Sequence, residues 1–134
     1  MQAKDRRRDV AHLFGLALIV RLAVAAAIPQ PGYTDTAYYT AGAVHMANGG
    51  GFAEPFIWNY LSDPAGLPHP GFLYWMPLPS LLAVPFAALF PGSFFAMQMP
   101  FALLSSALPV LAYVLAHRAT GERLLAWTAG VLAI

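Results

Sequence analysis

Charged side chains are scarce in this chain, and cysteine is absent from it. Only 10% of the 134 residues are Asp, Glu, Lys or Arg, against about 25% in an ordinary soluble domain. A soluble domain of this size needs more charged surface than that, so the composition predicts a protein whose solvent is the bilayer. The absence of cysteine excludes disulfides and thiolate metal sites. A net charge of +1, with no basic stripe beyond the first nine residues, argues against nucleic acid as a partner.

Apolar residues make up 59% of the chain and fall into long runs that predict membrane helices. Residues 10–28 and 94–116 each approach or exceed the roughly 20 residues that a spanning helix needs. The run at 76–90 is shorter and carries three prolines. The last run, 124–134, stops without a cap or a charged flank, so we expect the chain to be the N-terminal fragment of a longer protein. A signal peptide is the alternative for the first run, although Arg21 interrupts it.

Basic residues predict how these helices are oriented. Four cations precede the first run, and Arg118 and Arg123 mark a later polar turn, whereas residues 30–75 contain no Lys or Arg. The positive-inside rule then places the N-terminus and the later turn in the cytoplasm. Only one full crossing fits between the outer loop and that turn, so we expect 76–90 to be half-inserted or surface-lying. The alternative is that 76–90 spans and that Arg118 and Arg123 lie outside.

The predicted fold class is therefore an all-α, polytopic transmembrane protein of the plasma (inner) membrane. The outer loop also predicts a short surface helix, with Thr34 or Asp35 as its N-cap and a glycine run as its stop. The predicted boundaries are 1–9 (cytoplasmic), 10–28 (first span), 29–93 (outer loop, with juxtamembrane helices at about 36–48 and 76–90), 94–116 (second span), 117–123 (cytoplasmic loop) and 124–134 (start of a truncated third span).

The outer loop also carries an ordered set of short features. Arg21 is followed by Pro31-Gly32-Tyr33-Thr34-Asp35, Gly49-Gly50-Gly51, Pro68-His69-Pro70 and Tyr74-Trp75-Met76-Pro77. This order resembles the opening of the GT-C superfamily of membrane glycosyltransferases, in particular the protein O-mannosyltransferases of glycosyltransferase family 39 and the related aminoarabinose transferases. The resemblance implies transfer of a sugar from a polyprenyl-phosphate donor to an acceptor on the outer face of the membrane. The aminoarabinose transferases have a charged Glu-Lys-Pro-Pro-like stretch where this chain has Tyr74 to Pro77, so their substrate is not carried over.

Asp35 matches the family's catalytic acidic residue and is the candidate general base. An acceptor hydroxyl is a poor nucleophile that benefits from such a base. Polyprenyl phosphate is a good leaving group, so one carboxylate suffices, unlike the paired acids of glycosidases. The alternative for Asp35 is a helix cap alone. Arg21 would pair with the leaving phosphate or, alternatively, extend its side chain to the membrane surface.

A second set of residues provides candidates for binding the donor: Arg21, Tyr38, Tyr39, Glu54, Trp58, Asp63, His69, Tyr74 and Trp75. For Glu54 and Asp63, a solvated loop charge is the simpler interpretation. A divalent metal is left open as a cofactor, but His45 and His69 match no ligand spacing and no metal site is predicted. The expected partners are membrane lipid and the polyprenyl-phosphate sugar. The alternative function is a non-catalytic transporter or flippase component, disfavoured because the polar residues lie in the loop and, apart from Arg21, not within the helices.

Overall fold

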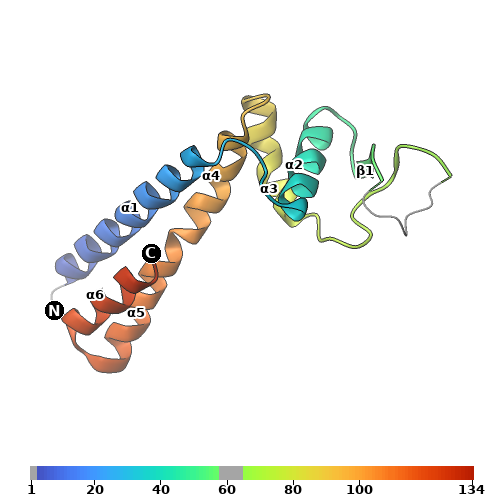
Figure 1. The fold of residues 1–134 in the computed structure, drawn as a ribbon. Coiled ribbons are helices and arrows are strands. Elements are labelled where there is room, and N and C mark those ends of the chain that lie inside the picture. Colours follow the sequence, from blue (N-terminus) through green and yellow to red (C-terminus); the bar gives the residue numbers. More distant parts are fainter. Residues whose placement is uncertain (1–2, 58–64) are drawn as a thin grey trace. The chain divides into compact units, whose positions relative to one another are not determined.

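The computed structural model describes residues 3–57 and 65–134. Helices dominate these residues, as the sequence predicted, and a pair of two-residue strands joins them (Figure 1). The chain divides into two compact units. Unit 1 comprises Met1–Ala27 and Phe101–Ile134, and unit 2 comprises Ile28–Pro100.

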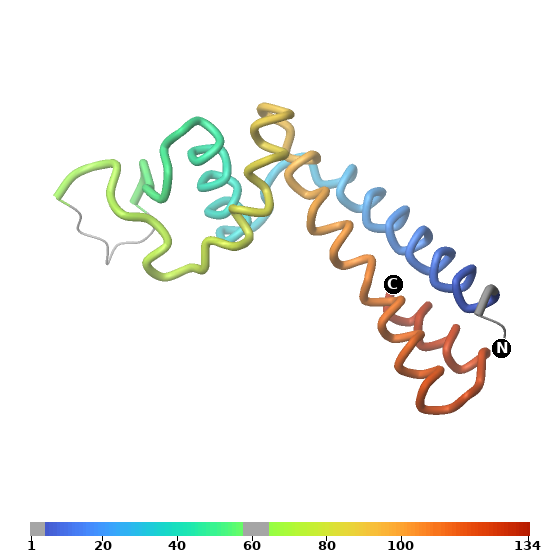
Figure 2. The backbone as a smooth tube through the Cα atoms, turned by 180° about the vertical axis from the view of Figure 1, so that it is seen from behind, coloured from blue at the N-terminus to red at the C-terminus, as the bar shows by residue number. Residues whose placement is uncertain are grey.

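Unit 1 is built from α1 (Ala3–Ala27), α5 (Ala107–Thr120) and α6 (Arg123–Leu132). Helices α5 and α6 form a hairpin and lie side by side in both views of the backbone (Figure 2). The hairpin turns at Gly121, whose φ of 73° is the left-handed conformation that ends many helices. The predicted polar loop at 117–123 is therefore shorter than expected: residues 117–120 are helical, and α6 already begins at Arg123.

The core of unit 1 contains three side chains without exposed surface, Leu13, Tyr113 and Ala126. Gly130 lies where α6 approaches α1 closely. A Cβ atom there would lie 2.8 Å from Leu13 Cδ1 and 3.2 Å from the Pro109 carbonyl oxygen. The packing of unit 1 thus depends on small residues of α6 as much as on large ones.

A buried carboxylate also links α1 to the hairpin. Asp9 is 2% exposed, and its Oδ2 accepts hydrogen bonds from Tyr113 Oη at 2.7 Å and Arg123 Nε at 2.8 Å. Arg123 Nη2 donates to the other oxygen at 2.6 Å. The guanidinium therefore binds the carboxylate with two parallel hydrogen bonds, the strongest geometry for such a pair.

Within residues 3–57 and 65–134, two helical stretches are long and apolar enough to cross a membrane, Asp5–Ala27 and Phe94–Thr120. The second combines α4 (Phe94–Ser105) with α5, and only Ser106 separates the two helices. Two further apolar helices, α3 (Leu78–Leu89) and α6, are shorter.

Unit 2 contains α2 (Thr34–Ala47), α3, the start of α4, and strands β1 (Ala53–Glu54) and β2 (His69–Pro70), which pair antiparallel. Helices α2 and α3 pack closely at Gly42, where a Cβ atom would lie 3.0 Å from the Phe72 ring and 3.1 Å from Ser80 Oγ. Ser80 Oγ donates a hydrogen bond to the Tyr39 carbonyl at 2.9 Å. Buried Ala43, Ala83, Ala87 and Met97 form the apolar core.

The first helix of unit 2 corrects one detail of the sequence prediction. Its N-cap is Tyr33, and no side chain caps it. Thr34 and Asp35 lie inside the helix, so neither is the N-cap. The extended conformation of Tyr33 (φ −142°, ψ 151°) places the helix start two residues before the predicted one. The helix predicted at 76–90 is α3, which begins after Pro77, with Pro79 in its first turn, where a missing N–H is tolerated.

Candidate functional site

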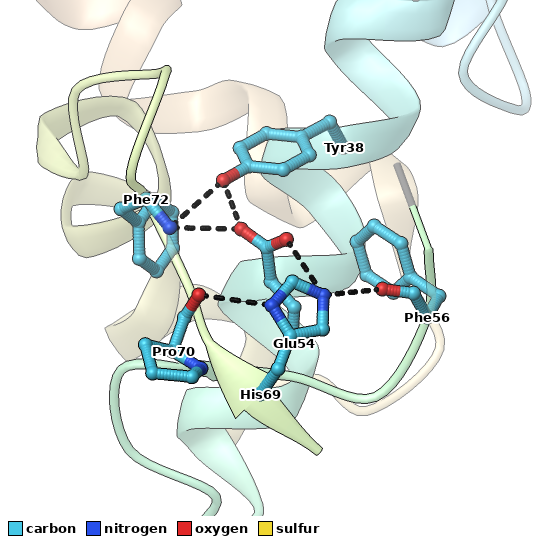
Figure 3. A network of polar contacts seen from close by, with 6 residues as sticks. All are labelled: Tyr38, Glu54, Phe56, His69, Pro70 and Phe72. Carbon is cyan, nitrogen blue, oxygen red and sulfur yellow. Dashed lines mark hydrogen bonds and ion pairs between the residues drawn. The ribbon is translucent and has the colours of Figure 1, made fainter. Parts of the chain in front are cut away.

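Unit 2 contains a buried glutamate. Glu54, at the end of β1, is 5% exposed, and one of its carboxylate oxygens accepts a hydrogen bond from the phenol of Tyr38 (Figure 3). The same oxygen accepts the backbone N–H of Phe72 at 2.8 Å. The interpretation of Glu54 as a solvated loop charge is therefore wrong. A buried carboxylate must be hydrogen-bonded, and Tyr38 and Phe72 supply the donors.

The backbone of residues 71 and 72 lies close to this carboxylate. A Cβ atom on Gly71 would lie 2.9 Å from Glu54 Cγ and 3.3 Å from the Ala53 carbonyl carbon, so only glycine fits without displacement. Phe72 has a φ of 61°, an uncommon conformation for a bulky residue. Such strain persists where the surrounding structure enforces it, and here it accompanies the N–H bond to Glu54.

His69 lies on the other side of the carboxylate. Its Nδ1 is 3.0 Å from the Pro70 carbonyl oxygen, its Nε2 is 3.1 Å from the Phe56 carbonyl oxygen, and Nε2 is also 3.7 Å from Glu54 Oε2 (Figure 3). Carbonyl oxygens only accept hydrogen bonds. Each ring nitrogen therefore bonds its carbonyl only when it carries hydrogen, and a protonated ring would also form an ion pair with Glu54.

Tyr38 is a neutral donor held in an aromatic cluster. Its ring makes edge-to-face contacts with Tyr39, Phe56 and Phe72 at centroid distances of 5.5, 6.0 and 5.7 Å. Burial and, next, the neighbouring Glu54 carboxylate raise the pKa of the Tyr38 phenol above its ordinary value of about 10. The phenol therefore remains a hydrogen-bond donor across the physiological pH range.

A small pocket opens beside this network. Its volume is about 20 Å³, which corresponds to one water-sized group. The residues that line it are Tyr38, Glu54, His69, Pro70, Leu73, Tyr74 and Trp75. The pocket therefore combines a buried carboxylate, an imidazole and aromatic rings, a composition typical of sites that orient a ligand with few polar groups.

The structure brings together five of the residues predicted to bind the donor: Tyr38, Glu54, His69, Tyr74 and Trp75. Tyr39 is adjacent through its ring contact with Tyr38. Trp58 and Asp63 lie outside the described residues. The sequence did not indicate Gly71, Phe72 or the Phe56 carbonyl, because backbone groups and a glycine contact leave no mark in a residue pattern.

Two other candidates lie elsewhere. Asp35 is half-buried in the first turn of α2 and does not line the pocket, and its carboxylate forms no hydrogen bond or ion pair with any residue that the structure describes. Arg21 belongs to unit 1, where its Nε donates to Ser105 Oγ at 2.8 Å and its Nη1 to the Ala17 carbonyl at 3.4 Å. Both alternatives for Arg21 stay open, because these partners are neutral.

The described residues contain no group of three or more His, Asp or Glu side chains that could hold a metal ion. His45 is not part of the Glu54 network; its ring packs against Gly50, where a Cβ atom would lie 2.0 Å from Nε2. In comparisons with known proteins, no family model, no curated protein and no solved structure matches this chain. The chemistry of the site therefore rests on its own geometry: a carboxylate and an imidazole beside exposed aromatic surface.

Proposed function

We propose that this chain is part of a GT-C type membrane glycosyltransferase that moves a sugar from polyprenyl phosphate to an acceptor on the outer face of the plasma membrane. The observation that supports this most directly is the pocket around Glu54. Residues chosen from the sequence as donor-binding candidates, up to 37 positions apart between Tyr38 and Trp75, line it together. A carboxylate among aromatic rings suits a ligand rich in hydroxyl groups.

Asp35 is the proposed general base of the transfer. Its carboxylate makes no hydrogen bond to the described residues, so its lone pairs are open to an acceptor. The acceptor hydroxyl would give its proton to Asp35 while its oxygen forms a bond to the anomeric carbon. The bond from that carbon to the phosphate breaks at the same time, and polyprenyl phosphate leaves with the electron pair.

The contacts within unit 1 support the proposed membrane orientation. Asp9 and Arg123 form an ion pair at 2.6 Å, so both must lie on one side of a membrane that the intervening chain enters. An even number of crossings must separate them, which α1 and the α4–α5 stretch provide. Helix α3 has 12 residues and is about 18 Å long, well short of the roughly 30 Å of a hydrocarbon core. This favours a surface or half-inserted α3.

The test is transfer by the full-length protein reconstituted in lipid vesicles with a panel of radiolabelled polyprenyl-phosphate sugars. We expect wild-type protein to release polyprenyl phosphate with one of them. The variant Asp35→Asn should lower kcat by about 100-fold or more, because a positioned base contributes about that much. Membrane insertion should be unchanged.

Glu122→Gln is the matched control. Like Asp35→Asn, it replaces an acid by its amide, but Glu122 is exposed and belongs to unit 1, whereas Asp35 is half-buried in unit 2. Its kcat should stay within about twofold of wild type, a surface effect. An Asp35→Asn variant as active as this control would remove Asp35 from the mechanism. Failure of the wild-type protein to use any polyprenyl-phosphate donor would contradict the proposed function itself.

A further inference from the structure

We propose that the pocket beside Glu54 is a recognition subsite for one hydroxyl group of a sugar, which donates a hydrogen bond to Glu54 Oε2 while the sugar ring lies against Tyr74. The assignment of that sugar to a polyprenyl-phosphate donor or its acceptor rests on the proposed function. The binding of a neutral, hydroxyl-bearing ring is inferred from the pocket alone. In this role Glu54 and Tyr74 determine specificity, and the proton transfer is left to Asp35.

The two oxygens of the Glu54 carboxylate differ in their hydrogen-bond partners. Oε1 accepts from Tyr38 and from the Phe72 N–H. Oε2 has only the His69 ring at 3.7 Å, beyond hydrogen-bond distance, among the residues that the structure describes. A buried anionic oxygen is stabilised by a donor. A ligand that enters the pocket can supply that donor.

The size of the pocket limits how much of a ligand can enter it. A volume of about 20 Å³ admits one water-sized group. A hydroxyl oxygen has the size of a water molecule, whereas a whole sugar ring does not fit. The ring must therefore stay at the mouth of the pocket and insert a single hydroxyl.

Charge distinguishes an ammonium group from a hydroxyl group as the donor to Glu54. An ammonium group is as small as a hydroxyl and would also donate to Glu54. However, both nitrogens of His69 face carbonyl oxygens, and its Nε2 lies 3.7 Å from Oε2, so a ring that can carry a positive charge already occupies this side of the carboxylate. A cation in the pocket would be repelled by that ring whenever it is protonated, whereas a neutral donor is accepted in either state.

Part of the pocket lining is exposed apolar and aromatic surface. Leu73 and Tyr74 both line the pocket, and they are 75% and 69% exposed. A large exposed ring beside a polar pocket provides an apolar platform with an oriented polar contact, the combination that holds small ligands. Tyr38 also lines the pocket and is 3% exposed, so the lining includes both a buried ring and an exposed one.

Direct binding tests this proposal without any transfer reaction. Saturation-transfer-difference NMR on the full-length protein in detergent micelles would use three probes: methyl α-D-mannopyranoside, tetrahydropyran as a ring without hydroxyl groups, and methylammonium as a small cation. We expect binding of the glycoside alone. Glu54→Gln should raise its Kd about tenfold, the loss expected for a hydrogen bond to a charged acceptor.

Two exposed tyrosines give a matched pair of variants. Tyr74→Ala should also raise the Kd about tenfold. Tyr33→Ala removes an equally exposed ring, 68% against 69%, at a position that does not line the pocket, and it should leave the Kd unchanged. Since Tyr74 is exposed, its variant should fold even if Glu54→Gln does not. Glu122→Gln is the control for Glu54→Gln.

Equal Kd values for Tyr74→Ala and Tyr33→Ala would overturn the proposal, as would wild-type binding of tetrahydropyran or methylammonium as tight as that of the glycoside. Absence of glycoside binding to wild-type protein would overturn it too. Pocket-dependent glycoside binding in a protein that transfers no sugar would contradict only the proposed function. Asp35-dependent transfer without pocket-dependent binding would contradict only the subsite.

Discussion

Tyr38 and Glu54 influence each other's chemistry through one hydrogen bond. Ionising the phenol would remove the donor and place a second negative charge beside a buried carboxylate. Burial and then Glu54 therefore raise the pKa of Tyr38 above that of an exposed tyrosine, about 10. Because the pKa is higher in the folded than in the unfolded chain, the stabilisation is complete below pH of about 10 and is lost as the pH rises further.

This predicts a tyrosine that resists alkaline titration. Phenolate absorbance of the full-length protein, minus that of the Tyr38→Phe variant, should stay near zero until well above pH of about 10. It should then rise together with the loss of folded protein, measured by circular dichroism. Free tyrosine in the same detergent serves as the reference. A difference signal that titrates with the reference would show that Tyr38 is not held by Glu54.

The residues of this site were predictable by type but not by partnership. The crowding of aromatic rings and acids in the loop indicated Glu54, His69 and Tyr74. Burial of Glu54 was not predictable, because its donors are a phenol 16 residues away and a backbone N–H 18 residues away. The close contact at Gly71 depends on strand pairing between β1 and β2, which two-residue strands do not reveal in sequence.

At the scale of helices, Asp9 connects α1, α5 and α6. Three hydrogen bonds from Tyr113 and Arg123 surround its carboxylate, and removing either partner leaves charge less well compensated in a buried place. Tyr113→Phe keeps the ring and deletes one donor, which should cost about 1–3 kcal/mol. Arg123→Ala should destabilise unit 1 more, because two donors and the opposite charge are lost.

Thermal unfolding of the full-length protein in detergent, detected as the loss of resistance to trypsin, would measure this order. Arg118→Ala is the control, since Arg118 is an exposed cation in the last turn of α5. The apparent Tm should fall in the order Arg118→Ala, Tyr113→Phe, Arg123→Ala, with the last variant the least stable. Equal Tm values for the two arginine variants would show that the Asp9 contact does not hold these helices.

Helix positions followed from apolar runs and helix-breaking residues, whereas their ends did not. Gly121 stops α5, but the sequence alone suggested a stop at Ala116, because His117 and Arg118 are polar. Cations are in fact favoured in the last turn of a helix, where the carbonyl dipoles point. Similarly, α2 begins at Thr34 because Tyr33 turns the chain, without the side-chain cap that the pattern predicted.

For the whole molecule, the proposed orientation depends on charge distribution and on one contact. Apart from Arg21, the cations lie near the two ends of the chain. The proposed orientation puts both ends on one side, as the ion pair between Asp9 and Arg123 would require in an inserted protein. Composition could predict the helices that are long and apolar enough to cross a membrane. It could not decide whether residues 76–90 cross, because a run of that length with three prolines suits either a short span or a surface helix.

The absence of cysteine from these 134 residues makes this orientation directly measurable, since an introduced thiol is the only one within them. Gly66 is exposed, and a Cβ atom at that position would meet no atom within 4 Å, so Gly66→Cys is suited to report on the outer loop. Glu122→Cys and Arg7→Cys report on the two positions proposed to lie in the cytoplasm, and both native side chains are exposed. In intact cells, a membrane-impermeant maleimide should label only Gly66→Cys. After permeabilisation it should label all three, because the positive-inside rule places Arg7 and Glu122 together. Labelling of Glu122→Cys in intact cells while Arg7→Cys stays protected would mean that α3 crosses the membrane. The Asp9–Arg123 pair could then not exist in the inserted protein, although Asp35 would still lie outside, since only α1 separates it from Arg7.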